Sequence, residues 1–263
     1  MKLAWLFVAL LPSLSLAQDR MGLPPLLRNV SIDQRLNQQV PLDIPFRDET
    51  GRTVQLRQYF HDKPVILSLV YYDCPMLCTL VLNGLVRAMR VISLSAGNQF
   101  SVVTVSFDPR ETPALAAAKK REYLDRYRRK GAEAGWHFLT GDESSIQALT
   151  RAVGFRYTFD PKSGQWAHAS GVMVLTPGGR LARYFYGVEY SGRDLRLALV
   201  EASANKIASP VDQFLLFCFH YDPATTKYGL AIVNLIRAAG VTTVFGISAM
   251  IFVLFRRERH AHG

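Results

Sequence analysis

The chain has 263 residues, and its 31 Lys and Arg against 21 Asp and Glu give a formal net charge of +10. This length allows one medium-sized domain with appended segments. The basic residues are scattered and accompany no groove-reading motif, so the charge does not indicate nucleic-acid binding. Attraction to an anionic membrane surface is a simpler use of the charge.

Residues 1–17 have the pattern of a secretory signal peptide. One basic residue, Lys2, precedes an apolar run that ends at Leu11, and small residues follow at Ser15 and Ala17. This arrangement predicts cleavage after Ala17 and export from the cytoplasm. An uncleaved anchor is the alternative, although the apolar run is short for a bilayer span.

An extended lead-in is expected at 18–40, followed by one domain at 41–207. The turn residues Thr50 and Gly51 predict a short hairpin within 40–54. Apolar runs predict strands at 65–71, 101–107, 136–139, 156–159, 171–175 and 181–185. Helical spacing and cap residues predict helices at 77–94, 112–130, 142–153 and 194–208. This alternation predicts an α/β fold with a mixed, mostly parallel sheet covered by helices on both faces.

The C-terminal part of the chain has the pattern of a membrane anchor. Residues 240–255 carry no charge and are followed at once by Arg256 and Arg257. A transmembrane helix is therefore expected at 229–255, with a cytoplasmic tail at 256–263. Together with the signal peptide, it predicts a single-pass protein of the bacterial inner membrane whose main domain faces the periplasm.

Two cysteines four residues apart, Cys74 and Cys78, lie between the first buried strand and the first long helix. Pro75 disfavours helical geometry at Cys74, and both sulfurs can lie near the helix N-terminus, where a thiolate is stabilised. The pair can close a disulfide or bind a soft metal, of which copper is favoured in an oxidising compartment. A disulfide between them would add little stability to the fold, because the loop that it closes is only about five residues long.

A metal bound by two thiolates usually takes a third ligand, often a histidine. His168 is the candidate, because it lies in a segment predicted to be a loop that leads into the buried run at 171–175. Its position alone does not decide between a ligand and a hydrogen-bonded structural histidine.

A second possible metal pair, Cys218 and His220, lies in the segment expected beside the membrane at 208–228. Two residues apart in an extended chain, they would share one face and could relay copper. The surrounding aromatic residues are typical of a belt at the headgroup level of a bilayer.

Several of these features together resemble the SCO/SenC family. They are Cys74-Pro75-x-x-Cys78 after an apolar strand, residues 106–109 (Ser-Phe-Asp-Pro), Thr112-Pro113, the single His168 before a strand, and residues 176–180. The resemblance covers about residues 40–207 and implies a thioredoxin-like copper chaperone of cytochrome c oxidase assembly. It implies copper, as Cu(I) or Cu(II), held by Cys74, Cys78 and His168. The implied partners are the copper-containing subunit of a terminal oxidase, other periplasmic copper carriers and thiol reductants.

The chain departs from the family pattern at Thr79, where a proline is common, and at Ala167, where an acidic residue is common. The second departure removes a possible partner for the His168 ring. The third departure is the expected membrane anchor, which lies at the C-terminus here and at the N-terminus in many family members. The alternative hypothesis is an enzyme, a thiol–disulfide reductase that uses Cys74 and Cys78 without needing His168.

Overall fold

A computed structural model describes residues 29–207, 221–222, 227–228, 237, 240–248 and 250–251. The chain divides into two compact units, Met1–Ile207 and Ala208–Gly263. The predicted signal peptide at 1–17 lies outside the described residues and stays a prediction.

A five-stranded sheet of order β10-β9-β4-β5-β6 forms the centre of the first unit. β4 (Val65–Val70), β5 (Ser101–Ser106) and β6 (Trp136–Leu139) run parallel, whereas β9 (Gly171–Leu175) and β10 (Leu181–Tyr186) add antiparallel pairings. Every residue of β4 and β9 is buried, as expected for central strands covered on both faces. The predicted strands of this sheet are confirmed. The sheet is mixed but not mostly parallel, because two of its four pairings are antiparallel.

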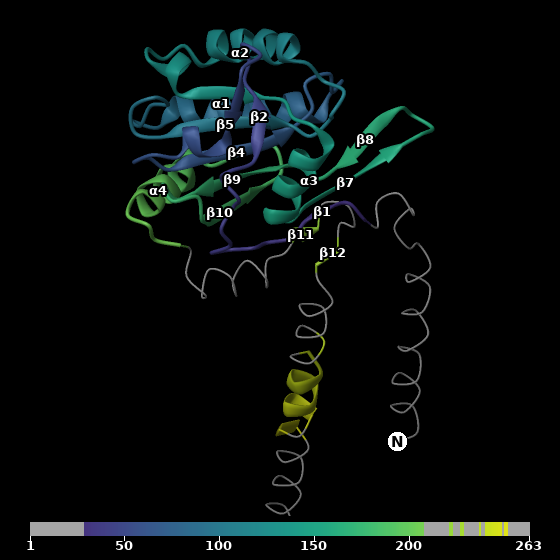
Figure 1. The fold of residues 1–263 in the computed structure, drawn as a ribbon. Coiled ribbons are helices and arrows are strands. Elements are labelled where there is room, and N and C mark those ends of the chain that lie inside the picture. Colours follow the sequence, from purple (N-terminus) through teal and green to yellow (C-terminus); the bar gives the residue numbers. More distant parts are fainter. Residues whose placement is uncertain are drawn as a thin grey trace, which may run out of the picture. The chain divides into compact units, whose positions relative to one another are not determined.

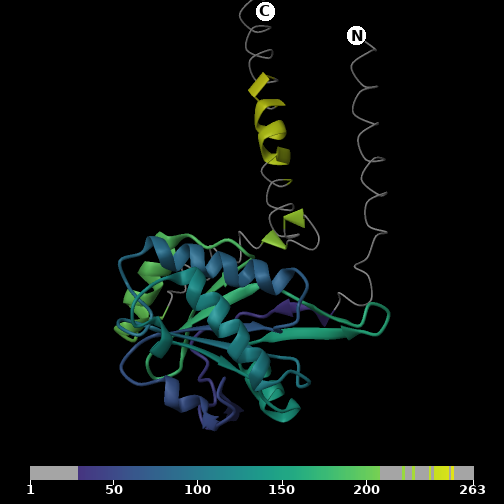
Figure 2. The same cartoon turned by 90° about the horizontal axis from the view of Figure 1, so that it is seen from above.

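Four α-helices cover this sheet: α1 (Leu77–Val91), α2 (Pro113–Tyr127), α3 (Glu143–Ala152) and α4 (Gly192–Ser203). Right-handed crossovers between the parallel strands place α1 and α2 on the same face. α1 packs against both α2 and α4, and α3 lies on the other side of the sheet (Figure 2). The predicted helices are confirmed; all four end earlier than predicted, and α4 begins two residues earlier.

A second, three-stranded sheet has the order β1-β7-β8. It consists of β1 (Ser31–Ile32), β7 (Phe155–Asp160) and β8 (Gln165–His168). β7 and β8 form a hairpin that extends from the body of the unit (Figure 1). The predicted loop before the buried run at 171–175 is wrong for residues 165–168, because this four-residue strand is ordered by cross-strand pairing rather than by its own pattern.

The predicted N-terminal hairpin is present as β2 (Pro45–Arg47) and β3 (Thr53–Gln55). Gly51 closes its turn at φ 87°, a left-handed conformation that glycine adopts without steric cost. A 3₁₀ helix (Leu56–Tyr59) follows, and a second one (Ala132–Ala134) precedes β6.

The structure contradicts the expected transmembrane helix at 229–255. Within the part of the chain that the structure describes, no helix is both long and apolar enough to cross a bilayer. The helical residues described in this segment are 237, 240–248 and 250–251. The predicted single-pass location in the bacterial inner membrane depended on that helix and is corrected with it.

The second unit contains a short antiparallel pair, β11 (Tyr221–Asp222) and β12 (Lys227–Tyr228). The candidate pair Cys218 and His220 lies outside the described residues, so its role stays a prediction.

Candidate metal centre

The turn between β4 and α1 presents both thiols. Cys74 lies in the turn, and Cys78 is the second residue of α1, which begins at Leu77. The helix therefore starts two residues after Pro75, at the residue where the sequence predicts it. Helix N-termini leave backbone N–H groups unpaired, and here the N–H of Cys78 donates to the sulfur of Cys74 at 3.3 Å.

The sulfur of Cys78 points back toward the end of β4. It accepts a hydrogen bond from the backbone N–H of Tyr71 at 3.3 Å. Both thiols are free and largely buried, with Cys74 9% and Cys78 3% exposed. The pair is thus held by backbone donors on a rigid strand-to-helix connection.

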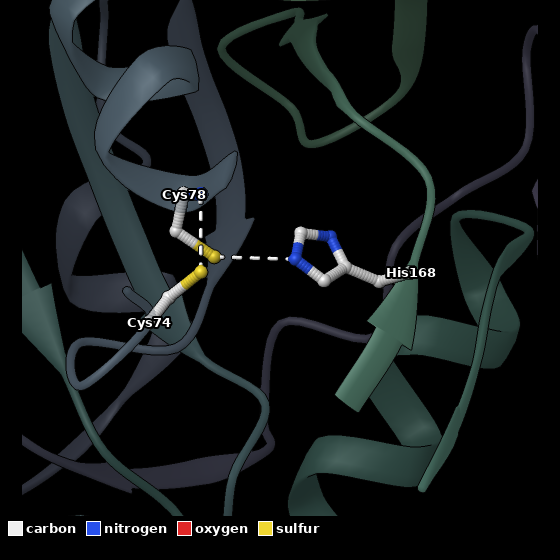
Figure 3. A group of neighbouring side chains, drawn as sticks. All are labelled: Cys74, Cys78 and His168. Carbon is white, nitrogen blue, oxygen red and sulfur yellow. Dashed lines mark hydrogen bonds between the residues drawn. The ribbon is translucent and has the colours of Figure 1, made fainter. Parts of the chain in front are cut away.

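His168 reaches the same point from the end of β8. Its Nε2 lies 3.3 Å from the sulfur of Cys78, and Figure 3 shows the imidazole facing both cysteines. Its Nδ1 lies 2.9 Å from the carbonyl oxygen of Ala169. Because a carbonyl can only accept, Nδ1 carries the proton and Nε2 offers its lone pair to the site.

This carbonyl supplies the second partner for the ring that Ala167 does not provide. Histidine ligands in metal sites commonly donate their other ring N–H to a carboxylate or a backbone carbonyl. The departure from the family pattern at residue 167 therefore leaves the ring orientation defined.

The candidate donor atoms of Cys74, Cys78 and His168 all lie within 4.8 Å of one another. Among the described residues this is the one group of three or more Cys, His, Asp or Glu side chains close enough to share an ion. Two sulfurs and one imidazole nitrogen are soft donors, and this set suits Cu(I) better than hard cations such as Mg²⁺ or Ca²⁺.

The two thiols differ in acidity. The hydrogen bond with the Cys78 thiol holds the pKa of Cys74 far below its ordinary value, against the opposing effect of burial. Burial, followed by the neighbouring Cys74 sulfur, raises the pKa of Cys78. At neutral pH the metal-free site therefore holds one thiolate, at Cys74, and one thiol, at Cys78.

Aromatic rings pack around the site and shield it from water. Tyr71 meets His168 edge-on, with ring centroids 5.8 Å apart. Burial, and then a hydrogen bond with Cys74, raise the pKa of Tyr71, so its hydroxyl stays protonated beside the Cys74 sulfur. Phe107 is fully buried, and its ring lies 5.1 Å from that of His168.

Two acidic residues support the site, although the sequence alone assigned neither of them a role. Glu111 and Asp108 follow β5, and their carboxylates contact the cysteine turn and the histidine hairpin. The signal available in the sequence was the pair of acidic residues directly after a buried strand, at the edge where strand ends meet. His137, in contrast, lies in β6 and packs against Tyr59 in a tilted arrangement with ring centroids 4.3 Å apart, consistent with a structural role.

The fold and site together define a thioredoxin-like protein that carries a Cys-x-x-x-Cys turn opposite a histidine. The model of the SCO1/SenC family matches residues 33–200, more than half of the chain. The chain belongs to the SCO1/SenC family.

The chain is also similar to solved structures. Two structures of proposed electron transfer and electron transport proteins from Aquifex aeolicus VF5 share 28% and 26% identity, with TM-scores of 0.57 and 0.54. Each match covers 65% of this chain, with 96% and 100% of the other chains. Arabidopsis thaliana ScoI, solved with copper bound, matches at 19% identity and a TM-score of 0.49, covering 62% of this chain and 96% of that one. A comparison with curated proteins finds no match.

Proposed function

We propose that this protein is a copper carrier that binds one Cu(I) through Cys74, Cys78 and His168. In this proposal it delivers the ion to the copper-containing subunit of a terminal cytochrome c oxidase during assembly. The family supports the role in oxidase assembly, and the donor set supports the metal.

One observation carries the proposal: three soft donor atoms from two distant parts of the sequence converge within 4.8 Å. A disulfide alone would need only the two cysteines of the turn. The imidazole adds nothing to a disulfide, whereas it completes a three-coordinate Cu(I) site.

The residues of the chain would act in a defined order on binding. Cys74 already carries negative charge and forms the first bond to the ion. Cys78 loses its proton as it binds, because a thiolate and not a thiol ligates metals. The carbonyl of Ala169 accepts a hydrogen bond from Nδ1 of His168 and so directs Nε2 toward the ion. Transfer to a partner is a ligand exchange in which no electron moves.

The deciding experiment is an anaerobic Cu(I) titration of the reduced full-length protein in competition with a chelator. We expect the wild type to bind one copper per chain, and His168→Ala to bind at least tenfold more weakly, because the loss of even an outer partner of a metal ligand costs about tenfold or more. His137→Ala is the matched control, because it removes a histidine outside the site. Equal binding by wild type and His168→Ala would reject the proposed site.

A thiol–disulfide reductase is the second candidate, favoured by the opposite pKa shifts of the two cysteines. The Cys74 thiolate would attack a partner disulfide and form a mixed disulfide. Cys78 would then displace the partner thiol and close a Cys74–Cys78 disulfide, so that two electrons pass to the partner. This function predicts that His168→Ala retains disulfide exchange, which separates it from the copper proposal.

A further inference from the structure

The connection between β5 and α2, residues 107–112, contacts both halves of the metal centre. We call it the bridging loop. On the thiol side, Glu111 accepts hydrogen bonds from the backbone N–H groups of Tyr72 at 2.8 Å and Asp73 at 2.7 Å. It also accepts one from the hydroxyl of Ser106 at 2.5 Å. Its carboxylate thus satisfies turn N–H groups that would otherwise lack a partner, and this fixes the turn that carries Cys74.

On the histidine side, the loop contacts β8 through Asp108. This carboxylate is 5% exposed and accepts a hydrogen bond from the indole Nε1 of Trp166 at 2.9 Å. Trp166 stands two residues before His168 in the same strand, so both side chains lie on one face of it.

Arg110 extends this contact to the second strand of the hairpin. Its guanidinium pairs with Asp108 at 2.5 Å and lies 5.2 Å over the ring of Phe159 and 5.8 Å over that of Trp166. Phe159 and Trp166 are direct cross-strand partners in β7 and β8. One carboxylate and one guanidinium therefore hold both strands of the hairpin.

The two sides of the loop are joined by a short and well-packed segment. Phe107 is fully buried, and its ring lies 5.6 Å from Tyr71 of the thiol turn and 5.1 Å from His168. Any change in the separation of the two halves must disturb this packing or break the contact of Asp108 with Trp166.

Resting on the proposed copper function, we propose that the bridging loop sets the rate of copper release. The contacts of Trp166 with Asp108 and Arg110 form a latch that holds the histidine hairpin against the thiol turn. Opening the latch lets His168 withdraw, and the ion is left on two thiolates that an acceptor can replace. Copper–ligand bonds break and copper–acceptor bonds form, no electron moves, and the thiols recover protons from solvent.

The test is the variant Trp166→Phe, which removes the indole N–H and keeps an aromatic ring at the position. Cu(I)-loaded full-length protein is mixed with excess bathocuproine disulfonate, and the appearance of the chelator complex gives the release rate. We expect both proteins to bind one copper per chain. Copper release should be about tenfold faster from Trp166→Phe, which is the smallest effect commonly found when an outer partner of a metal ligand is lost.

The matched control is Trp136→Phe. Trp136 also donates its indole N–H over 2.9 Å, but to Thr104 inside the sheet and away from the site. The same chemical change there should destabilise the fold without changing release by more than twofold. If both variants accelerate release alike, loss of stability is the cause and the latch is rejected.

A measurement without copper separates this proposal from the proposed function. In the reduced, metal-free protein we expect amide hydrogen exchange in β7 and β8 to be faster in Trp166→Phe than in wild type, and unchanged there in Trp136→Phe. Unchanged exchange or unchanged release in Trp166→Phe would each overturn the latch. If the wild type takes up no copper, the proposed function fails, and the exchange data alone decide whether the loop holds the hairpin.

Discussion

Two cysteines of the same short turn occupy different electrostatic environments. Cys74 receives hydrogen bonds, from Cys78 above all, that stabilise its negative charge, whereas Cys78 is more deeply buried and lies beside that charge. Neighbouring ionisable groups with strong coupling commonly separate in this way, one acidic and one basic. This difference in acidity suits a metal carrier. The Cys74 thiolate can bind the ion first, while the Cys78 thiol keeps its proton until the ion arrives.

This asymmetry predicts selective alkylation of the reduced, metal-free protein. Because the pKa of Cys74 is lowered, its thiolate persists as the pH falls, and we expect iodoacetamide to modify Cys74 at similar rates from about pH 5 to about pH 8. Cys78, whose pKa is raised, should react at least about tenfold more slowly across this range. Peptide mass spectrometry measures both sites at once. Faster modification of Cys78 than of Cys74 would contradict the assignment.

At the scale of single elements, helix caps account for where several helices begin. Thr112 accepts from the N–H of Leu115, Asp142 from Ser145 and Ser191 from Asp194. α1 is the exception, since its cap residue Met76 makes no side-chain bond. The sulfur of Cys74 accepts the N–H of Cys78 instead, so the start of this helix and the state of the thiol are coupled.

The cap of α3 gives a pH-dependent prediction. The hydrogen bond from the backbone N–H of Ser145 is the main cause that lowers the pKa of Asp142. A lowered folded pKa means that the stabilisation is present above the unfolded value of about 3.9 and is lost as the pH falls through the folded pKa. We expect Asp142→Ala to lower the free energy of unfolding by about 1 kcal/mol at neutral pH and by less in acid.

Urea denaturation of both proteins at about pH 7 and about pH 3 measures this difference. Asp142→Asn is the control, because an uncharged cap should keep most of the stability and lose its dependence on pH. A difference between Asp142→Ala and wild type that grows in acid would refute the linkage.

For the whole molecule, copper would join two parts of the domain that are distant in the sequence. The thiols belong to the first crossover of the central sheet, and the histidine belongs to the smaller β1-β7-β8 sheet. A ligand that binds both parts only in the folded state must stabilise the whole domain.

Reduced protein should therefore melt at a higher temperature when it holds Cu(I). At free copper 100 times the dissociation constant the gain is about 2.7 kcal/mol, or roughly 5–10 °C for a domain of this size. His168→Ala should show a smaller shift, and protein with an oxidised Cys74–Cys78 pair should show none. Calorimetry gives these shifts, and an equal shift in the oxidised protein would argue against thiol ligation.

Local sequence patterns determined most of the elements of this fold. Continuous apolar runs predict β4, β5 and β9, since a strand buried on both faces has no polar side to alternate. Cap and turn residues such as Thr112, Asp142 and Gly51 placed helix starts and a hairpin turn, because their side chains or their φ angles act within a few residues. The cysteine turn could also be predicted, because Pro75 and the spacing of Cys74 and Cys78 act within a few residues.

What only the tertiary structure decided is the arrangement across the sequence. β8 is a strand because β7 pairs with it, and this pairing delivers His168 to 3.3 Å from Cys78. The carbonyl of Ala169 orients the ring, although no local pattern marks this role, and Glu111 closes the thiol turn from the loop after β5. Long-range pairing, burial and hydrogen bonding depend on which segments meet in space. The sequence by itself therefore determined the candidate ligands, whereas the fold decided that they meet and what holds them together.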